Sequence, residues 1–136
     1  MLVLGIESSC DDTSAAVLEN GSLVLSNVIS DQNTTHSKYG GVVPELAGRC
    51  HIESIHHVIT KAINQSKIGL KQIDLIAVTV GPGLVSSLLV GLNTAKALAY
   101  ALQKPLVGVN HLEGHLLAIF LEETVEFPFI ALTVSG

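Results

Sequence analysis

Two histidines four residues apart are the side chains whose spacing best suits a metal ion. His111 and His115 flank the segment Leu-Glu-Gly. At positions i and i+4 of a helix they lie on one face, about 40° apart, where both imidazoles can bind one ion. Glu113 lies about 200° round the helix from His111, so it is not placed as the general base of a zinc-protease motif. The alternative is a solvated helix face, and a stable metal site needs a further ligand from elsewhere.

A polar turn between two short apolar runs is the second candidate. It runs from Ser8 to Asp12. Its hydroxyl groups and backbone N–H groups suit phosphate oxygens, and Asp11 or Asp12 could hold a metal-bound water or orient a nucleophile. The alternative is an ordinary turn whose side chains cap their own backbone. Cys10 stands within this turn and is interpreted, like Cys50, as a packing residue rather than a nucleophile.

Two glycine-containing segments are weaker candidates. Gly81-Pro82-Gly83 precedes an expected helix N terminus, where backbone N–H groups could meet an anion, although Gly and Pro also simply end strands. Val134-Ser135-Gly136 follows an expected strand, a common position for ligand contacts in α/β sheets. The remaining histidines are interpreted as surface or partly packed residues. They are His36, His51, His56 and His57.

The elements that position these residues follow from the apolar pattern. Short apolar runs predict strands, and a period of three to four residues predicts helices. Asn20-Gly21 indicates a type I′ hairpin turn, because both central positions of that turn need a positive φ. Residues 31–41 carry no apolar period and are expected to form a loop. Strands are expected over 2–6, 13–18, 23–29, 74–80, 106–109 and 127–134, and helices over 44–65, 84–102 and 111–121.

The resulting order, β-β-β-α-β-α-β-α-β, indicates the fold class. A three-stranded meander followed by β-α crossovers opens the ribonuclease H-like and actin-like ATPase lobes, which are α/β folds with a mixed sheet covered by helices. The chain contains no internal repeat, linker or low-complexity tract. We therefore expect one domain over residues 1–136.

Composition excludes several classes of protein. Hydrophobic residues make up 48% and charged residues only 14% of the 136 residues, so the chain is not disordered and we expect part of its apolar surface to be covered by another body. A net charge of -5 excludes a self-sufficient nucleic-acid binder. Two cysteines and no secretion signal favour the cytoplasm. Gly81-Pro82-Gly83 interrupts the uncharged stretch 75–95, which disfavours a membrane span.

Taken together, the motifs resemble those of the tRNA threonylcarbamoyladenosine transferase family, within the actin and sugar-kinase ATPase superfamily. The matching blocks follow the family's order over the whole sequence, at 5–13, 40–47, 81–84, 111–115 and 134–136. The resemblance implies that His111 and His115 bind one divalent metal ion, iron or zinc. It also implies that Asp11 and Asp12 form a catalytic acidic pair. Four residues would begin the loop that binds the substrate and its AMP moiety, namely Thr133, Val134, Ser135 and Gly136.

The resemblance further implies that the chain is the N-terminal lobe of a longer, two-lobed acyltransferase. Family members are more than twice as long, and their second lobe carries an aspartate that completes the metal site. The expected reaction transfers threonylcarbamoyl from threonylcarbamoyl-AMP to N6 of the adenosine beside the anticodon, in tRNAs that read codons beginning with A. Expected partners are tRNA, a paralogous dimerisation subunit and a small ATPase subunit, with no membrane. The lobe alone is expected to be inactive.

Two other interpretations remain open at this stage. A non-catalytic dimerisation lobe of the same complex is disfavoured, because the related short paralogues lack the His-x-Glu-Gly-His segment. A metallo-glycopeptidase is disfavoured by the position of Glu113 off the face of the two histidines.

Overall fold

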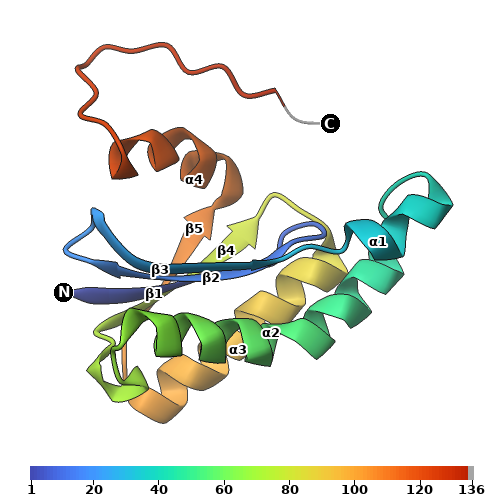
Figure 1. Cartoon of the computed structure of the whole chain (residues 1–136), viewed down its shortest axis with the longest axis horizontal. Helices are drawn as coiled ribbons and strands as arrows, with labels where there is room; N and C mark the ends of the chain where they lie inside the picture. Colours follow the sequence, from blue (N-terminus) through green and yellow to red (C-terminus); the bar gives the residue numbers. More distant parts are fainter. Residues whose placement is uncertain (135–136) are drawn as a thin grey trace.

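A mixed sheet of five strands, in the order β3-β2-β1-β4-β5, forms the framework of the computed structural model, which describes residues 1–134. β1 and β3 both pair antiparallel with β2, whereas β4 lies parallel to β1 and to β5 (Figure 1). This arrangement confirms the expected meander and mixed sheet. The strands are β1 (Leu2–Glu7), β2 (Thr13–Glu19), β3 (Leu23–Ser30), β4 (Leu75–Gly81) and β5 (Leu106–Asn110).

The hairpin between β2 and β3 turns where the sequence predicts it. Asn20 and Gly21 have φ values of 53° and 82°. Both are positive, as the two central positions of a type I′ turn require. On β2, the side chains of Thr13, Ala15 and Val17 are buried while the residues between them are partly exposed. One face of this strand therefore packs on the core.

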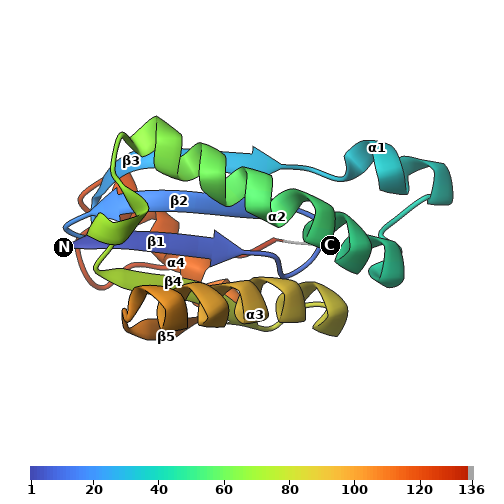
Figure 2. The same cartoon turned by 90° about the horizontal axis from the view of Figure 1, so that it is seen from below.

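Two long helices cover one face of the sheet. α2 (Pro44–Ser66) lies over β2 and β3, and α3 (Val85–Leu102) lies beside it over β4 (Figure 2). Pro44 stands at the start of α2, where its missing N–H removes no helical hydrogen bond. The core lies between these helices and the sheet, and its largest cluster includes Leu4, Ile6, Val17, Ile55, Val58, Ile59, Ile76, Val78 and Ala95.

A short helix lies on the opposite face. α4 (His111–Leu117) follows β5 without a break and continues as a 3-10 helix over Ala118–Leu121 (Figure 1). The helix expected over 111–121 is thus present, but its last four residues take the tighter form. α4 contacts β4 and β5, so it sits above the half of the sheet in which the strands are parallel.

Two expectations from the pattern are wrong. Residues 31–41 are not all loop, because α1 (Asn33–His36) and a 3-10 helix over Ser37–Tyr39 form there. Residues 127–134 form no strand. Instead of pairing with a strand, the aromatic rings of Phe127 and Phe129 pack with Phe120, with centroids 5.2–5.8 Å apart. The final strand of the expected order is therefore missing from the part of the chain that the structure describes.

α3 is the one helix among residues 1–134 that is long and apolar enough to cross a membrane by length and composition alone. In this fold it packs against β4 and α2. A core helix of a soluble domain passes the same length and composition test.

Candidate functional site

Three neighbouring parallel strands end at the same edge of the sheet, and the candidate site is built there. β1 ends at Glu7, β4 carries Thr79 near its end, and β5 ends at Asn110. Carboxyl ends of parallel strands are the usual position of ligand sites in α/β sheets. The side-chain oxygen of Asn110 accepts hydrogen bonds from the backbone N–H groups of Leu112, at 2.9 Å, and Glu113, at 3.4 Å. This cap starts α4 immediately, so that His111 is its first residue.

A carboxylate orients the first histidine. Nδ1 of His111 lies 3.1 Å from Oε2 of Glu7, to which it donates. The hydroxyl of Thr79 donates to the same oxygen at 2.5 Å, and the backbone N–H of Ser9 donates to Oε1. Because the proton of His111 sits on Nδ1, the lone pair of its Nε2 is free to bind a metal.

The electrostatics of Glu7 favour its charged form. Burial raises the pKa of this carboxyl, but hydrogen bonds from Thr79, Ser9 and His111 together outweigh burial, and the net pKa lies below its usual value. A carboxylate accepts a stronger hydrogen bond from an imidazole N–H than a neutral acid does. Glu7, in its charged form, therefore accepts a strong hydrogen bond from His111.

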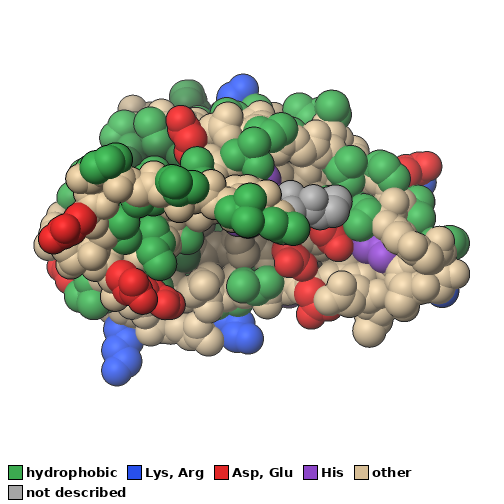
Figure 3. All heavy atoms as spheres, turned by 90° about the horizontal axis from the view of Figure 1, so that it is seen from above, with side chains coloured by type: hydrophobic (Ala, Val, Ile, Leu, Met, Phe, Trp, Pro, Cys, Tyr) green, Lys and Arg blue, Asp and Glu red, His purple; other side chains and the backbone are tan. Residues whose placement is uncertain are grey.

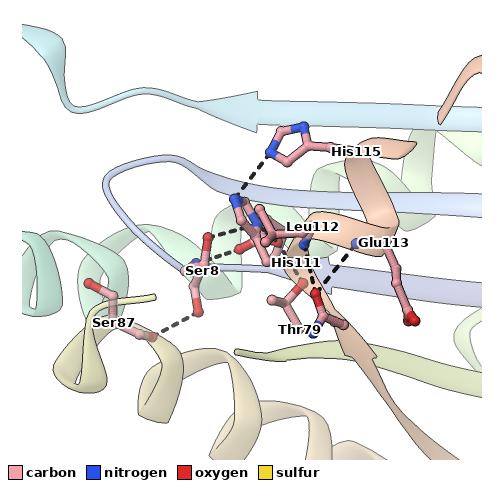
Figure 4. Close-up of polar contacts among 10 residues, drawn as sticks. Ser8, Thr79, Ser87, His111, Leu112, Glu113 and His115 are labelled. Atoms are coloured by element: carbon pink, nitrogen blue, oxygen red, sulfur yellow. Dashed lines mark hydrogen bonds and ion pairs between the residues drawn. The ribbon is translucent and has the colours of Figure 1, made fainter. Parts of the chain in front are cut away.

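The second histidine completes a pair of facing nitrogens. Nε2 of His115 lies 3.1 Å from Nε2 of His111, with the rings nearly perpendicular (Figure 4). Two nitrogens bound at about 2.0–2.1 Å to one tetrahedral ion lie roughly 3.4 Å apart, and closer at smaller bond angles. The spacing fits shared coordination. Glu113 points away from both rings, as its place on the helix predicts.

Residues 1–134 supply no complete metal cage. No group of three or more His, Cys, Asp or Glu side chains in that range is arranged to hold one ion. Two imidazole donors suit iron or zinc better than calcium or magnesium, which prefer oxygen ligands. The two histidines thus fit two positions of a transition-metal site.

The polar turn lies against this site through its first residues. Ser9 places its hydroxyl 3.1 Å from Nδ1 of His111, and its carbonyl accepts the backbone N–H of Leu84 at 2.7 Å. A Cβ on Gly83 would lie 2.5 Å from that carbonyl oxygen, so only glycine fits there. The Gly81-Pro82-Gly83 segment therefore packs on the turn. The close approach of the two backbones explains why residue 83 is a glycine.

The two aspartates stand further along the turn. Asp11 is half-buried and Asp12 exposed, and within residues 1–134 neither makes a hydrogen bond or ion pair with His111 or His115. Partial burial raises the pKa of Asp12, as do the charges of Asp11 and Asp31, against a smaller opposing effect of His51. Asp12 consequently holds a proton more readily than an ordinary aspartate.

Cys10 has the electrostatics of an inert thiol. Burial raises its pKa, and a hydrogen bond to Asp11 and the nearby carboxylates of Asp11, Asp12 and Glu7 raise it further. A reactive cysteine needs a lowered pKa. This agrees with the interpretation of Cys10 as something other than a nucleophile, although its side chain is exposed rather than packed.

The expected substrate loop reaches the site from the chain's last residues. Thr133 and Val134 line a cavity of about 600 Å³ together with His115. Leu116, Ile119 and residues 129–132 complete most of its wall. Figure 3 shows hydrophobic side chains gathered on this face of the molecule around a hollow. The other two expected loop residues, Ser135 and Gly136, lie outside the described residues.

Comparison with known proteins gives a consistent result. The family model for tRNA N6-adenosine threonylcarbamoyltransferase matches residues 23–136. Relatives of that name from Thermodesulfovibrio yellowstonii and Geotalea uraniireducens are 63% and 57% identical to the chain over its whole length. The chain belongs to this family. It spans about 40% of the length of these relatives.

Solved structures share the fold. YeaZ from Pseudomonas aeruginosa superposes with a TM-score of 0.60 over 81% of this chain and 45% of its own. A second protein, described as similar to the peptidase YeaZ of that organism, gives 0.65 over 90% and 49%. At 21% identity in both cases, the likeness shows the fold alone, an actin-like α/β lobe as the motifs predict.

Sequence reasoning missed the role of Glu7. It stands in the family block 5–13, but its partners His111 and Thr79 are 104 and 72 residues away, and nothing local indicates them. One signal was available. A carboxylate that ends a buried apolar strand lies at the sheet edge where ligands bind, and metal-binding histidines commonly donate to such a group.

Proposed function

We propose that this chain is the N-terminal lobe of a metal-dependent acyltransferase that moves threonylcarbamoyl from threonylcarbamoyl-AMP to N6 of the adenosine beside the anticodon. The substrates would be tRNAs that read codons beginning with A. Family membership supports the transfer to tRNA, and the Glu7–His111–His115 arrangement is the observation that carries the metal dependence. The chain covers only part of its relatives, so the whole activity belongs to the full-length protein, meaning this lobe joined to a second.

His111 and His115 would hold one divalent ion, Fe²⁺ or Zn²⁺, with an aspartate of the second lobe as a further ligand. When bound, such an ion supplies a positive charge that binds and polarises phosphate or carbonyl oxygens of the adenylate. Glu7 would keep the ring of His111 in the orientation and tautomer that binding requires. His115, on the same helix face, would supply the second nitrogen.

The remaining residues would bind the acyl adenylate and move a proton. Thr133 and Val134, which line the cavity beside His115, would hold the AMP moiety, and Ser135 and Gly136 would contribute as the next residues of the same loop. The N6 nitrogen would form a bond to the carbamoyl carbon as the bond from that carbon to the phosphate oxygen breaks. Asp11 or Asp12 would accept the N6 proton or organise the groups that do.

Partners would supply what this lobe lacks. With a net charge of -5, it would not hold tRNA unaided. From the family resemblance we infer a paralogous dimerisation subunit and a small ATPase subunit in the same complex, and the exposed apolar side chains offer surface that such partners could cover. Neither a membrane nor an oxidising compartment is required, and two unpaired cysteines suit the cytoplasm.

Neither alternative function gains support. The chemical role that we propose for the facing histidines would not be needed in a dimerisation lobe. Glu113, on the other side of α4, has no access to a water held by His111 and His115, so a glycopeptidase would lack its general base.

The decisive assay supplies the full-length protein, purified with its partner subunits, with threonylcarbamoyl-AMP and transcribed tRNA. Nucleosides are then analysed by mass spectrometry. Transcripts that read codons beginning with A should gain threonylcarbamoyl-adenosine. A transcript whose anticodon reads codons beginning with another base should not. Residues 1–136 alone should modify neither. No product with the full-length protein, or modification by the lobe alone, would contradict the proposal.

A further inference from the structure

A fully buried histidine on α2 plays no part in the site described so far. His51 is 0% exposed. Its Nε2–H donates to the backbone carbonyl of Cys10 at 3.0 Å. The hydroxyl of Ser87, on α3 and equally buried, donates to the same carbonyl at 2.9 Å. One carbonyl of the polar turn is thus held by donors from both long helices.

This double hold fixes the peptide that leads into the acidic pair. In a trans peptide, the C=O and the following N–H point in opposite directions. The Cys10 carbonyl points at the buried side chains of His51 and Ser87, so the N–H of Asp11 points away from the two helices. The orientation of this one peptide plane therefore determines how Asp11 leaves the turn, and Asp12 follows directly.

The rest of the turn is anchored on either side of that peptide. Ser8 donates from its hydroxyl to the carbonyl of Ser87 at 2.8 Å and accepts the N–H of Gly91 at 3.1 Å. After the aspartates, the hydroxyl of Thr13 lies 2.7 Å from Nδ1 of His51 and 2.8 Å from the hydroxyl of Ser54. His51 contacts the chain on both sides of the aspartates, at Cys10 before them and at Thr13 after them, which no other side chain does among the hydrogen bonds of residues 1–134.

We propose that His51 is a positioning residue, which holds the Cys10 carbonyl together with Ser87 and so sets the direction of Asp11 and Asp12 for transfer. This proposal rests on the role proposed above for the two aspartates. His51 itself is enclosed between α2 and the turn and touches no substrate.

Two substitutions separate positioning from simple packing. In His51→Gln the side-chain amide reaches the position of Nε2 and can still donate to Cys10. In His51→Asn the shorter amide reaches only the position of Nδ1, beside Thr13, and leaves the Cys10 carbonyl with Ser87 alone. Both variants lose the aromatic ring, so we expect both melting temperatures to fall.

The expected kinetics differ between the two. Misplacing a catalytic group by about 1 Å can cost 100-fold, so His51→Asn should lower kcat for transfer at least about tenfold in the full-length protein. His51→Gln should stay within about threefold of the wild type, and KM for tRNA should change little in either. Equal kcat values for the two variants would overturn the positioning role, because packing alone would then explain His51.

A spectroscopic measurement reads the hold directly. Cys is followed directly by Asp only at Cys10-Asp11 in this sequence. When the full-length protein is labelled with ¹³C at the carbonyl of Cys and ¹⁵N in Asp, residues 1–136 therefore contribute a single HNCO signal. We expect that signal to move in His51→Asn and in Ser87→Ala, and to stay near its wild-type position in His51→Gln. An unmoved signal in His51→Asn and Ser87→Ala would overturn the inference.

Asp11→Asn and Asp12→Asn keep the two proposals distinguishable. If both transfer at the wild-type rate, the catalytic role of the acidic pair is wrong, and with it the purpose of the positioning. If either loses transfer while His51→Asn and His51→Gln remain alike in kcat and in the HNCO signal, the acidic pair stands and the role of His51 is wrong.

Discussion

The two ends of the candidate site are held very differently. At one end, Glu7, Ser9 and Thr79 fix His111 through hydrogen bonds between β1, β4 and α4. At the other end, the segment leading to Thr133 and Val134 exposes its apolar side chains, with Ile130 fully exposed and Leu132 87% exposed. The comparison teaches that residues 1–121 hold the proposed metal-binding histidines through their own hydrogen bonds, whereas the proposed substrate loop leaves most of its apolar side chains exposed.

The largest expected effect is a loss of metal affinity when the hydrogen bond between Glu7 and His111 is weakened. Glu7→Gln replaces a charged acceptor with a neutral one and should weaken Zn²⁺ binding to the full-length protein about 10–100-fold, because groups that orient metal ligands contribute that much. Competition with a chelator measures the affinity. Glu113→Gln, on the opposite side of α4, is the matched control and should bind Zn²⁺ as the wild type does. Equal affinities for the two variants would contradict the role of Glu7.

The packing of the polar turn gives the next largest effect. In Gly83→Ala the new Cβ would meet the backbone oxygen of Ser9 at 2.5 Å, so the turn must move, which should destabilise the fold by about 1–3 kcal/mol. Gly114→Ala is the control, because its Cβ would meet nothing within 4 Å and alanine favours a helix. Urea unfolding measures both. A Gly83→Ala variant as stable as the wild type would show that the close approach is unimportant.

A substitution in the exposed segment that leads to Thr133 and Val134 should affect stability mainly through contacts with the second lobe, and little through contacts within residues 1–136. Leu132→Ser in residues 1–136 alone should change the free energy of unfolding by no more than about 0.5 kcal/mol, as an exposed site does. In the full-length protein the loss should be larger, because we propose that the second lobe covers this segment. Thermal unfolding of both forms tests the difference. Equal, small losses in the two would remove the argument that the loop needs the second lobe.

The smallest expected effect concerns Asp12. Its pKa is raised in the folded protein, so the native state binds the proton more tightly than the unfolded chain, and stability falls as pH rises through these values. Asp12→Asn removes that loss and should raise the melting temperature slightly at pH 7. At a pH of about 3, below the unfolded pKa of aspartate, the gain should disappear. A gain that persists at low pH would mean that charge is not its cause.

Much of the fold could be predicted from the sequence because its signals are local. Five of the six expected strands and both long helices follow from apolar periods, and Asn20-Gly21 indicates its own turn. The wrong strand over 127–134 has the right composition, but no strand of residues 1–134 pairs with it, and its phenylalanines pack on one another instead. An apolar pattern alone does not show whether a neighbouring strand is available to pair with the segment.

The candidate site likewise has a part that local sequence signals predict and a part that depends on long-range contacts. The spacing of His111 and His115 indicates a metal pair, since a helix places positions i and i+4 on one face. The hold of Glu7 on His111 and of His51 on Cys10 joins residues 104 and 41 positions apart, and only the folded sheet brings them together. The motifs identify the groups that we propose bind the metal, and the structure identifies the groups that orient them.

The metal pair is the centre of this account, and one double variant tests it most directly. His111→Ala combined with His115→Ala in the full-length protein should abolish bound iron or zinc, measured by elemental mass spectrometry. It should also lower transfer to tRNA at least about 100-fold, because a bound metal stabilises charge in the transition state. Circular dichroism should show an intact fold, since His115 is exposed, His111 is partly exposed and neither belongs to the buried core. Unchanged metal content together with unchanged transfer would contradict the account.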